Sequence, residues 1–192
     1  MAEKIHLIAI FENFSNLICS NLNKIMSRGF VKEDDQEEAP FIPPRAALPA
    51  GVINYVTPAG LQELQEERDR LGLERTNLIA ENDTERRRAL AVIDGKMNLL
   101  QERINSARVL EPSEQPDDEV RFGAEVKLKN LQKNTLQKFK IVGIDEADVK
   151  KQKIAFVAPI ARAVTGKKVG EITEFKLGNE VRELEILEIN YE

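Results

Sequence analysis

Phe139-Lys-Ile-Val-Gly-Ile-Asp-Glu-Ala-Asp148 and Ala158-Pro-Ile-Ala-Arg-Ala-Val-Thr-Gly-Lys167 are the two stretches that decide the fold of this chain. The first predicts a β-strand that ends in an acidic turn. The second predicts the end of a strand, then a proline, then a short helix over Ile160–Val164 that Gly166 closes. A strand followed closely by a short helix indicates a small mixed domain.

The residues around these two stretches alternate with the period of two that is typical of strands. The pattern predicts strands at Phe122 with Val126–Leu128, Phe139–Val142, Ile154–Val157, Ile172–Leu177 and Leu184–Ile189. Together with the short helix they predict an α+β domain with a mostly antiparallel sheet over residues 119–192. The preceding residues 111–118 are interpreted as a linker.

A helical period replaces the strand period on the N-terminal side of this linker. Thr57 is a suitable N-cap and Pro58 suits a first helical position. Two apolar series then follow heptad spacing: Leu61, Leu64, Leu71 and Leu78, and Leu90, Ile93, Met97, Leu100, Ile104 and Ala107. Two arms of similar length predict an antiparallel helical hairpin, or coiled coil, over residues 57–110.

The polar break between the arms predicts the tip of the hairpin at Glu81-Asn-Asp-Thr-Glu85, with Asp83 or Thr84 capping the returning helix. Gly95 interrupts the second arm, where a glycine costs about 1 kcal/mol relative to alanine. Two explanations remain open: a bend, or close contact with the first arm.

The N-terminal quarter of the chain has a different character. Residues 1–25 carry apolar side chains at helical spacing and are interpreted as an apolar extension, with Met26 as an alternative start. Residues 26–56 contain the acidic run Glu33–Glu38 and four prolines, and they predict a solvated linker.

Composition excludes several classes of protein. The net charge of −5 lacks the basic excess of a free-standing duplex-DNA binder, so the expected partner is a protein. Cys19 and His6 are the only residues of their types, so an intrachain disulfide cannot form and a Cys/His zinc site is excluded. No catalytic motif and no membrane-spanning run are recognised, and a cytoplasmic location is expected.

Four segments together resemble the Gre-type bacterial transcription elongation factors, the GreA/GreB family. They are Thr57-Pro-Ala-Gly-Leu-Gln-Glu-Leu-Gln-Glu-Glu67, Phe122-Gly-Ala-Glu-Val126, Ile141-Val-Gly-Ile-Asp-Glu-Ala-Asp148 and Ala158-Pro-Ile-Ala-Arg-Ala163. The resemblance covers roughly residues 55–190. It implies an FKBP-like C-terminal domain that docks at the rim of the RNA polymerase secondary channel, and a hairpin that enters the channel.

The resemblance also implies roles for particular residues. The positions that match the family's docking surface are Asp145, Glu146, Asp148, Pro159, Ile160, Ala161 and Arg162. At the tip, Glu81, Asp83 and Glu85 are expected to help hold a Mg²⁺ ion shared with the polymerase, because this ion prefers carboxylate oxygen. Arg86, Arg87 and Arg88 are candidates for contact with RNA or with an acidic polymerase surface. No intrinsic cofactor is expected, RNA and template DNA are expected only within the polymerase complex, and the chain is expected to be a monomer.

In the family pattern, a glutamate follows the tip aspartate three residues later. In this chain Arg86 stands three residues after Asp83, so the tip departs from that pattern. Each arm also looks about one heptad shorter, which removes roughly 10 Å of reach. Two mechanisms therefore remain open: stimulated cleavage of backtracked RNA, or occupancy of the channel without cleavage. An FKBP-like prolyl isomerase is a further alternative, although phenylalanines that alternate along strands are more simply core.

Overall fold

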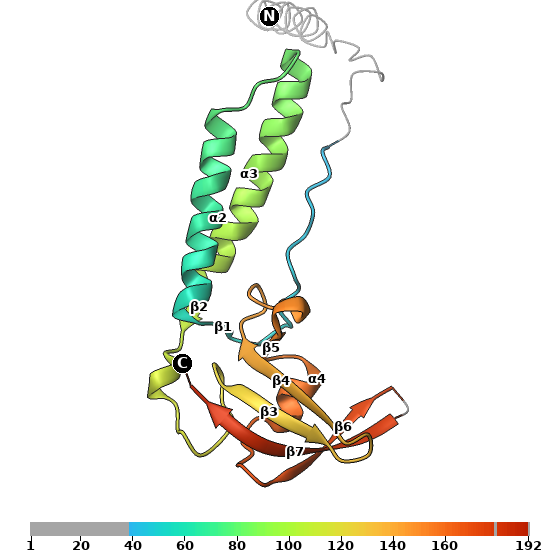
Figure 1. The fold of residues 1–192 in the computed structure, drawn as a ribbon. Helices are drawn as coiled ribbons and strands as arrows, with labels where there is room; N and C mark the ends of the chain where they lie inside the picture. Colours follow the sequence, from blue (N-terminus) through green and yellow to red (C-terminus); the bar gives the residue numbers. More distant parts are fainter. Residues whose placement is uncertain (1–38, 179, 192) are drawn as a thin grey trace, which may run out of the picture. The chain divides into compact units, whose positions relative to one another are not determined.

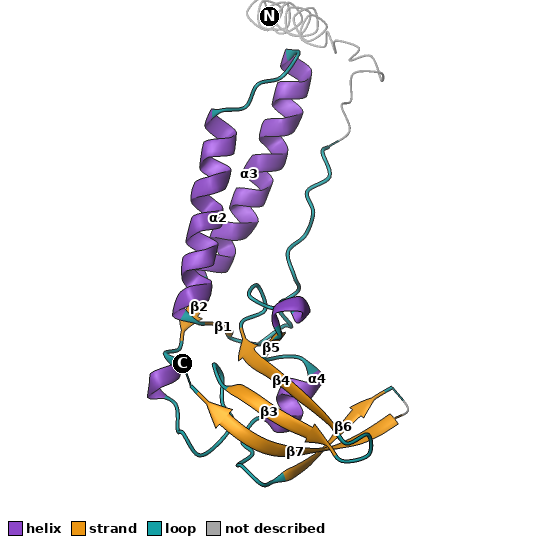
Figure 2. Cartoon of the chain, viewed as in Figure 1, coloured by secondary structure: helices purple, strands orange, loops and turns teal. Residues whose placement is uncertain are grey.

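The computed structural model describes residues 39–178 and 180–191, which form a helical hairpin and a small sheet domain (Figure 1). The predicted apolar extension, the acidic run, His6 and Cys19 lie outside the described residues. Figure 2 shows long helices confined to the hairpin, whereas the sheet domain is built mainly from strands. This arrangement is the α+β architecture that the sequence predicts.

Helices α2 (Pro58–Thr76) and α3 (Asp83–Asn105) form the hairpin. The Thr57 hydroxyl accepts from the Gly60 N–H at 2.9 Å, so Thr57 caps α2 as predicted. The cap of α3 is Asn82, whose side chain accepts from the Glu85 N–H at 2.8 Å. The prediction of Asp83 or Thr84 as the cap is wrong by one or two residues, because the amide of Asn82 already satisfies the first turn.

The heptad leucines form the core of the hairpin. Leu64, Leu71, Ile93 and Leu100 are buried, and Leu61, Met97, Ile104 and Ala107 pack at the edge of this core. Leu78 lies beyond the end of α2, in the loop over residues 77–82. Within the described ranges, no helix combines the length and apolar character needed to cross a membrane.

The sheet domain contains five strands in the order β5-β4-β3-β7-β6. They are β3 (Glu125–Asn130), β4 (Thr135–Val142), β5 (Lys153–Ala155), β6 (Ile172–Leu177) and β7 (Glu180–Asn190). Neighbours are antiparallel except for β4 and β5, which are parallel. Alternate residues of β3 point into a core that also contains Ala161 and Val164 of helix α4 (Pro159–Val164).

The predicted solvated linker is partly ordered. Strand β1 (Asn54–Val56) pairs in parallel with β2 (Ala107–Val109), which joins the two ends of the hairpin. Val56 is buried in the hairpin core, because its apolar side chain faces Leu64 and Leu100 at the base. A 3₁₀ turn (Pro112–Glu114) lies within the predicted linker over residues 111–118.

Two leucines of the hairpin give a matched test of its core. Leu100 is fully buried, whereas Leu73 is 64% exposed. We expect Leu100→Ala to lower the free energy of unfolding by about 2–5 kcal/mol, since it removes buried methyl groups and leaves a cavity. Leu73→Ala should change it by less than about 0.5 kcal/mol. Urea denaturation measures both, and equal effects would contradict the assignment of this heptad face.

Candidate functional site

The acidic turn after β4 lies at the junction between the hairpin and the sheet domain. The side chain of Glu146 is buried, and its carboxylate accepts from the backbone N–H groups of Thr57 at 3.0 Å and of Gly143 at 3.1 Å. It also accepts from the Thr57 hydroxyl. A carboxylate of the sheet domain therefore sits at the N-terminus of α2, where the helix dipole favours negative charge.

Two glycines make room for this carboxylate. A Cβ atom at Gly60 would lie 2.0 Å from Cδ of Glu146, and one at Gly143 would lie 2.7 Å from its Oε1. Both distances are shorter than a carbon atom tolerates, so any side chain at either position would displace Glu146. The two glycines and Glu146 are one structural unit, although 83 residues separate Gly60 from Gly143 in sequence.

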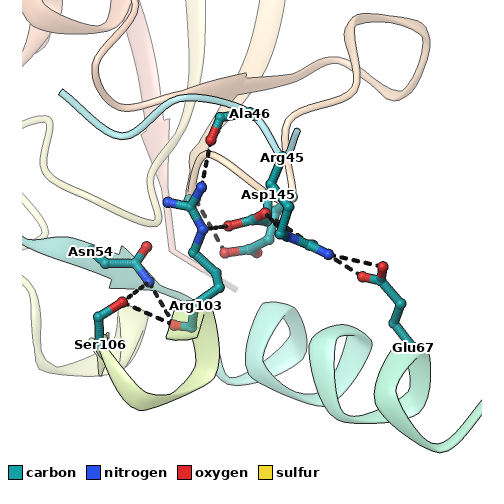
Figure 3. A network of polar contacts seen from close by, with 9 residues as sticks. Arg45, Ala46, Asn54, Glu67, Arg103, Ser106 and Asp145 are labelled. Carbon is teal, nitrogen blue, oxygen red and sulfur yellow. Dashed lines mark hydrogen bonds and ion pairs between the residues drawn. The ribbon is translucent and has the colours of Figure 1, made fainter. Parts of the chain in front are cut away.

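Asp145 holds a second set of contacts at the same junction (Figure 3). Its side chain is only 5% exposed. The Arg45 Nε donates to Oδ1 at 3.0 Å, and the Arg103 Nε lies 3.0 Å from Oδ2. The second contact is an ion pair rather than a well-directed hydrogen bond, because Oδ2 lacks an aligned donor.

Arg45 also reaches helix α2. Its two terminal nitrogens donate to the two oxygens of Glu67 at 2.9 and 3.0 Å, which is the bidentate geometry that guanidinium favours. The pKa of Arg45 is raised above its ordinary value, chiefly because Glu67 accepts from the guanidinium, with Asp145 adding a second negative charge. Arg45 therefore stays cationic and links α2 to the acidic turn.

An aromatic cluster completes the junction. The rings of Tyr55, Phe122 and Phe156 lie 5.7–5.9 Å apart, with tilted or edge-on faces. Tyr55 belongs to β1 at the hairpin base, whereas Phe122 and Phe156 belong to the sheet domain. Such pairs add about 0.5–1.5 kcal/mol beyond the area that they bury.

The seven residues of the predicted docking surface differ in their exposure to solvent. Asp145, Glu146 and Ala161 are held inside the protein and are not available to a partner in this conformation. Donors within the protein bind both carboxylates. Pro159 and Arg162 are exposed, and Asp148 and Ile160 are partly exposed, so these four residues remain on the surface.

The tip also differs from its predicted form. The loop over residues 77–82 carries Ile79, which is 94% exposed, and Asp83 and Glu85 already belong to α3. Glu81 and Glu85 line one shallow hollow together with Leu78, Ile79, Ala80 and Ala89. Asp83 lies outside that hollow, because residues 83 and 85 project about 200° apart around a helix.

The three arginines behind the tip are exposed on the first two turns of α3, and Arg87 contacts the Thr84 hydroxyl at 3.4 Å. In the part of the chain that the structure describes, no group of three or more histidine, cysteine or acidic side chains is placed to hold a metal ion.

Sequence reasoning missed Arg45 and Arg103, which hold the junction. Arg45 lies in a proline-rich stretch that reads as linker, and Arg103 lies on a charged helix, so neither shows a local signal. The glycines on either side of the junction were the available signal, because a glycine in the first turn of α2 has no local conformational purpose.

Comparison with known proteins identifies the family of this chain. Residues 115–191 match the family model described as "Transcription elongation factor, GreA/GreB, C-term". A GreA from Thermodesulfovibrio yellowstonii is 34% identical over 152 residues, which cover 71% of this chain and 96% of that protein. The chain belongs to the GreA/GreB family. The alignment is too long to lie within the sheet domain alone, so it also includes hairpin residues.

Two further curated relatives match over different lengths. A GreA from Mesoplasma florum is 34% identical over 139 residues, covering 72% of this chain and 86% of that protein. For a GreA from Neisseria meningitidis, the identity is 36% over 100 residues, covering 52% of this chain and 63% of the relative. A solved GreA/GreB factor from Nitrosomonas europaea is 19% identical, with a TM-score of 0.36, and covers 73% of this chain and 99% of that one.

The Glu146 contacts predict a specific loss of stability. Glu146→Gln keeps the Oε1 that accepts from the two backbone N–H groups, but it removes the negative charge and puts an N–H₂ group where Oε2 accepts from the Thr57 hydroxyl. We expect the free energy of unfolding to fall by about 1–3 kcal/mol. Asp148→Asn is the matched control, since the partly exposed Asp148 accepts from the Lys150 N–H at 2.9 Å and pairs with the exposed Lys151 at 3.9 Å. Urea denaturation of both variants measures the difference. Equal stability of Glu146→Gln and wild type would contradict the assigned network.

Proposed function

We propose that this chain is a transcription elongation factor that binds RNA polymerase through its sheet domain and inserts its hairpin into the secondary channel. The observation that carries the proposal is the family match over both parts, combined with a junction of buried ion pairs that joins them. A hairpin that acts at a distance from its docking domain needs a fixed connection to that domain. The factor would work as a monomer and meet RNA and template DNA only inside the polymerase complex.

In this proposal the factor is an accessory protein that acts through the active site of the polymerase. Glu81 and Glu85 are the carboxylates that support it best, because they line the same hollow at the tip. Two carboxylates on one face could complete the coordination of a Mg²⁺ ion that the polymerase already holds, and this ion keeps much of its own water. Asp83 contributes less, since it projects to another side of α3.

A second candidate is occupancy of the channel without stimulated cleavage. The supporting observation is Ile79, an isoleucine with 94% of its surface exposed in the loop at the hairpin tip. Leu78, Ala80 and Ala89 line the same hollow as Ile79, so the tip presents a group of apolar side chains, and a contiguous apolar surface favours contact with a partner. In this second proposed function, the apolar tip makes the contact inside the channel, and the carboxylates lie beside it without binding a metal ion.

Prolyl isomerisation is the weaker alternative. Such an enzyme needs open aromatic walls around a proline ring. Phe139 and Phe175 lie in the sheet-domain core, and Phe122 and Phe156 pack against each other and against Tyr55. These contacts occupy the rings that would otherwise line a pocket.

The surface residues near helix α4 give a test of docking. We expect Arg162→Glu to weaken co-purification with core RNA polymerase at least tenfold, because a like charge across an interface costs several kcal/mol. Arg182→Glu is the control, since Arg182 lies on β7 beside Glu180. A titrated pull-down measures both affinities. Equal affinity of the Arg162 variant and wild type would remove α4 from the docking surface.

The tip carboxylates give a test of chemistry. We expect Glu81→Ala with Glu85→Ala to lower RNA cleavage in a stalled elongation complex at least tenfold, while affinity for the polymerase is unchanged. A lost metal ligand weakens only the reacting state. Asp83→Ala is the matched control and should keep most of the activity.

The same stalled complex separates the two candidates. Full cleavage by the Glu81/Glu85 variant would reject the ligand role. A wild type that gives no cleavage but displaces a cleavage-active GreA would favour channel occupancy. A wild type that does neither would reject the channel proposal.

A further inference from the structure

A short segment outside the hairpin and outside the sheet domain is fastened to the junction between them. Arg45 contacts Glu67 of α2 and Asp145 of the acidic turn, and the Ala46 carbonyl accepts from the Arg103 guanidinium (Figure 3). We define Ile42–Ala46 as the strap. It follows the α3 side of the hairpin, since its residues line shallow hollows with Lys96, Leu99, Glu102, Arg103 and Ser106.

The strap has a second fixed point on α3. A Cβ atom at Gly95 would lie 2.2 Å from Cδ1 of Ile42, so the side chain of Ile42 occupies the space that glycine leaves open. The close contact with the first arm that the sequence left open for Gly95 is wrong, because the nearest atoms belong to Ile42 of the strap. Because Gly95 and Arg103 are eight residues apart on α3, the two fixed points lie about 12 Å apart along the helix axis.

We propose that Arg45 is a positioning residue that sets the angle of the hairpin relative to the sheet domain. Asp145 belongs to the sheet domain, Glu67 to the first arm and Arg103 to the second arm, and Arg45 contacts two of these three directly. Its planar guanidinium fixes direction as well as distance, because each nitrogen donates along its own line. Without Arg45, the acidic turn would keep one ion pair to the hairpin in place of two.

Burial favours this role over that of an ordinary surface ion pair. The exposed fractions are 20% for the Arg45 side chain, 5% for Asp145 and 11% for Arg103. Removing Arg45 leaves Glu67 without its bidentate partner and Asp145 with Arg103 alone, so the remaining groups rearrange toward solvent. The rearrangement would be a change in hairpin angle, since each of these groups is attached to a different element.

The test measures that angle in the free protein. Spin labels at Glu74→Cys near the tip and at Lys133→Cys in the β3–β4 turn, in a Cys19→Ser background, report the distance by double electron–electron resonance. We expect one narrow distribution for the parent and at least a twofold broader one for Arg45→Ala. Arg45→Lys should be intermediate, because lysine keeps the charge but loses the bidentate geometry.

Two further variants separate positioning from stability. Arg75→Ala removes the exposed Arg75–Asp94 ion pair between the two arms and should leave the distribution unchanged. Gly95→Ala should displace Ile42 and broaden the distribution, although alanine has a higher helix propensity than glycine. If the distance distribution broadens in a variant whose helix is more stable, a loss of stability cannot explain the change in hairpin position.

The width of the distance distribution decides whether the proposal holds. An Arg45→Ala distribution as narrow as that of the parent overturns the proposal, and so does a parent distribution as broad as that of the variant. The measurement uses no polymerase, so its failure is distinct from failure of the proposed function, which the pull-down and cleavage assays measure.

Discussion

Two neighbouring carboxylates, Asp145 and Glu146, hold the two parts of this protein together. The hairpin and the sheet domain have separate apolar cores, and the aromatic cluster of Tyr55, Phe122 and Phe156 is the apolar contact described between them. The rest of the joint is polar. The Glu146 carboxylate accepts a hydrogen bond at the N-terminus of α2. The Asp145 carboxylate contacts the guanidinium groups of Arg45 in the strap and of Arg103 in α3.

A polar joint of this kind is compatible with few other arrangements of the hairpin and the sheet domain. A buried carboxylate is costly unless donors surround it, so only the arrangement that supplies all of them is favourable. Here the donors come from a helix start, a strand end and two arginines. The glycines at positions 60 and 143 are required for the same reason, because a side chain at either would block the approach of Glu146. The result is directional, whereas an apolar contact of similar size could slide.

Periodic elements could be predicted from the sequence, and tertiary contacts could not. The strands after residue 119, helix α4 and the two arms follow local apolar patterns, and the structure confirms them, except that Phe122 lies in a turn before β3. The cap of α3 was misplaced because Asn82, Asp83 and Thr84 are all good capping residues, and only the geometry of the loop selects one. Asp145 and Glu146 were predicted on the surface because a sequence does not show which distant donors will cover a charge. The strap was interpreted as linker because its prolines and small residues resemble one.

The length of the hairpin makes the quality of this joint important for function. Helix α2 has 19 residues and extends about 28 Å, so a rotation of 10° at its base moves its far end by about 5 Å. A carboxylate must lie within about 2.1 Å of a Mg²⁺ ion to bind it. A loosely joined hairpin would still reach a channel, but it would not hold a ligand in place. The joint therefore matters more for catalytic assistance than for occupancy of a channel, and its stiffness is the property on which the two candidate functions differ most.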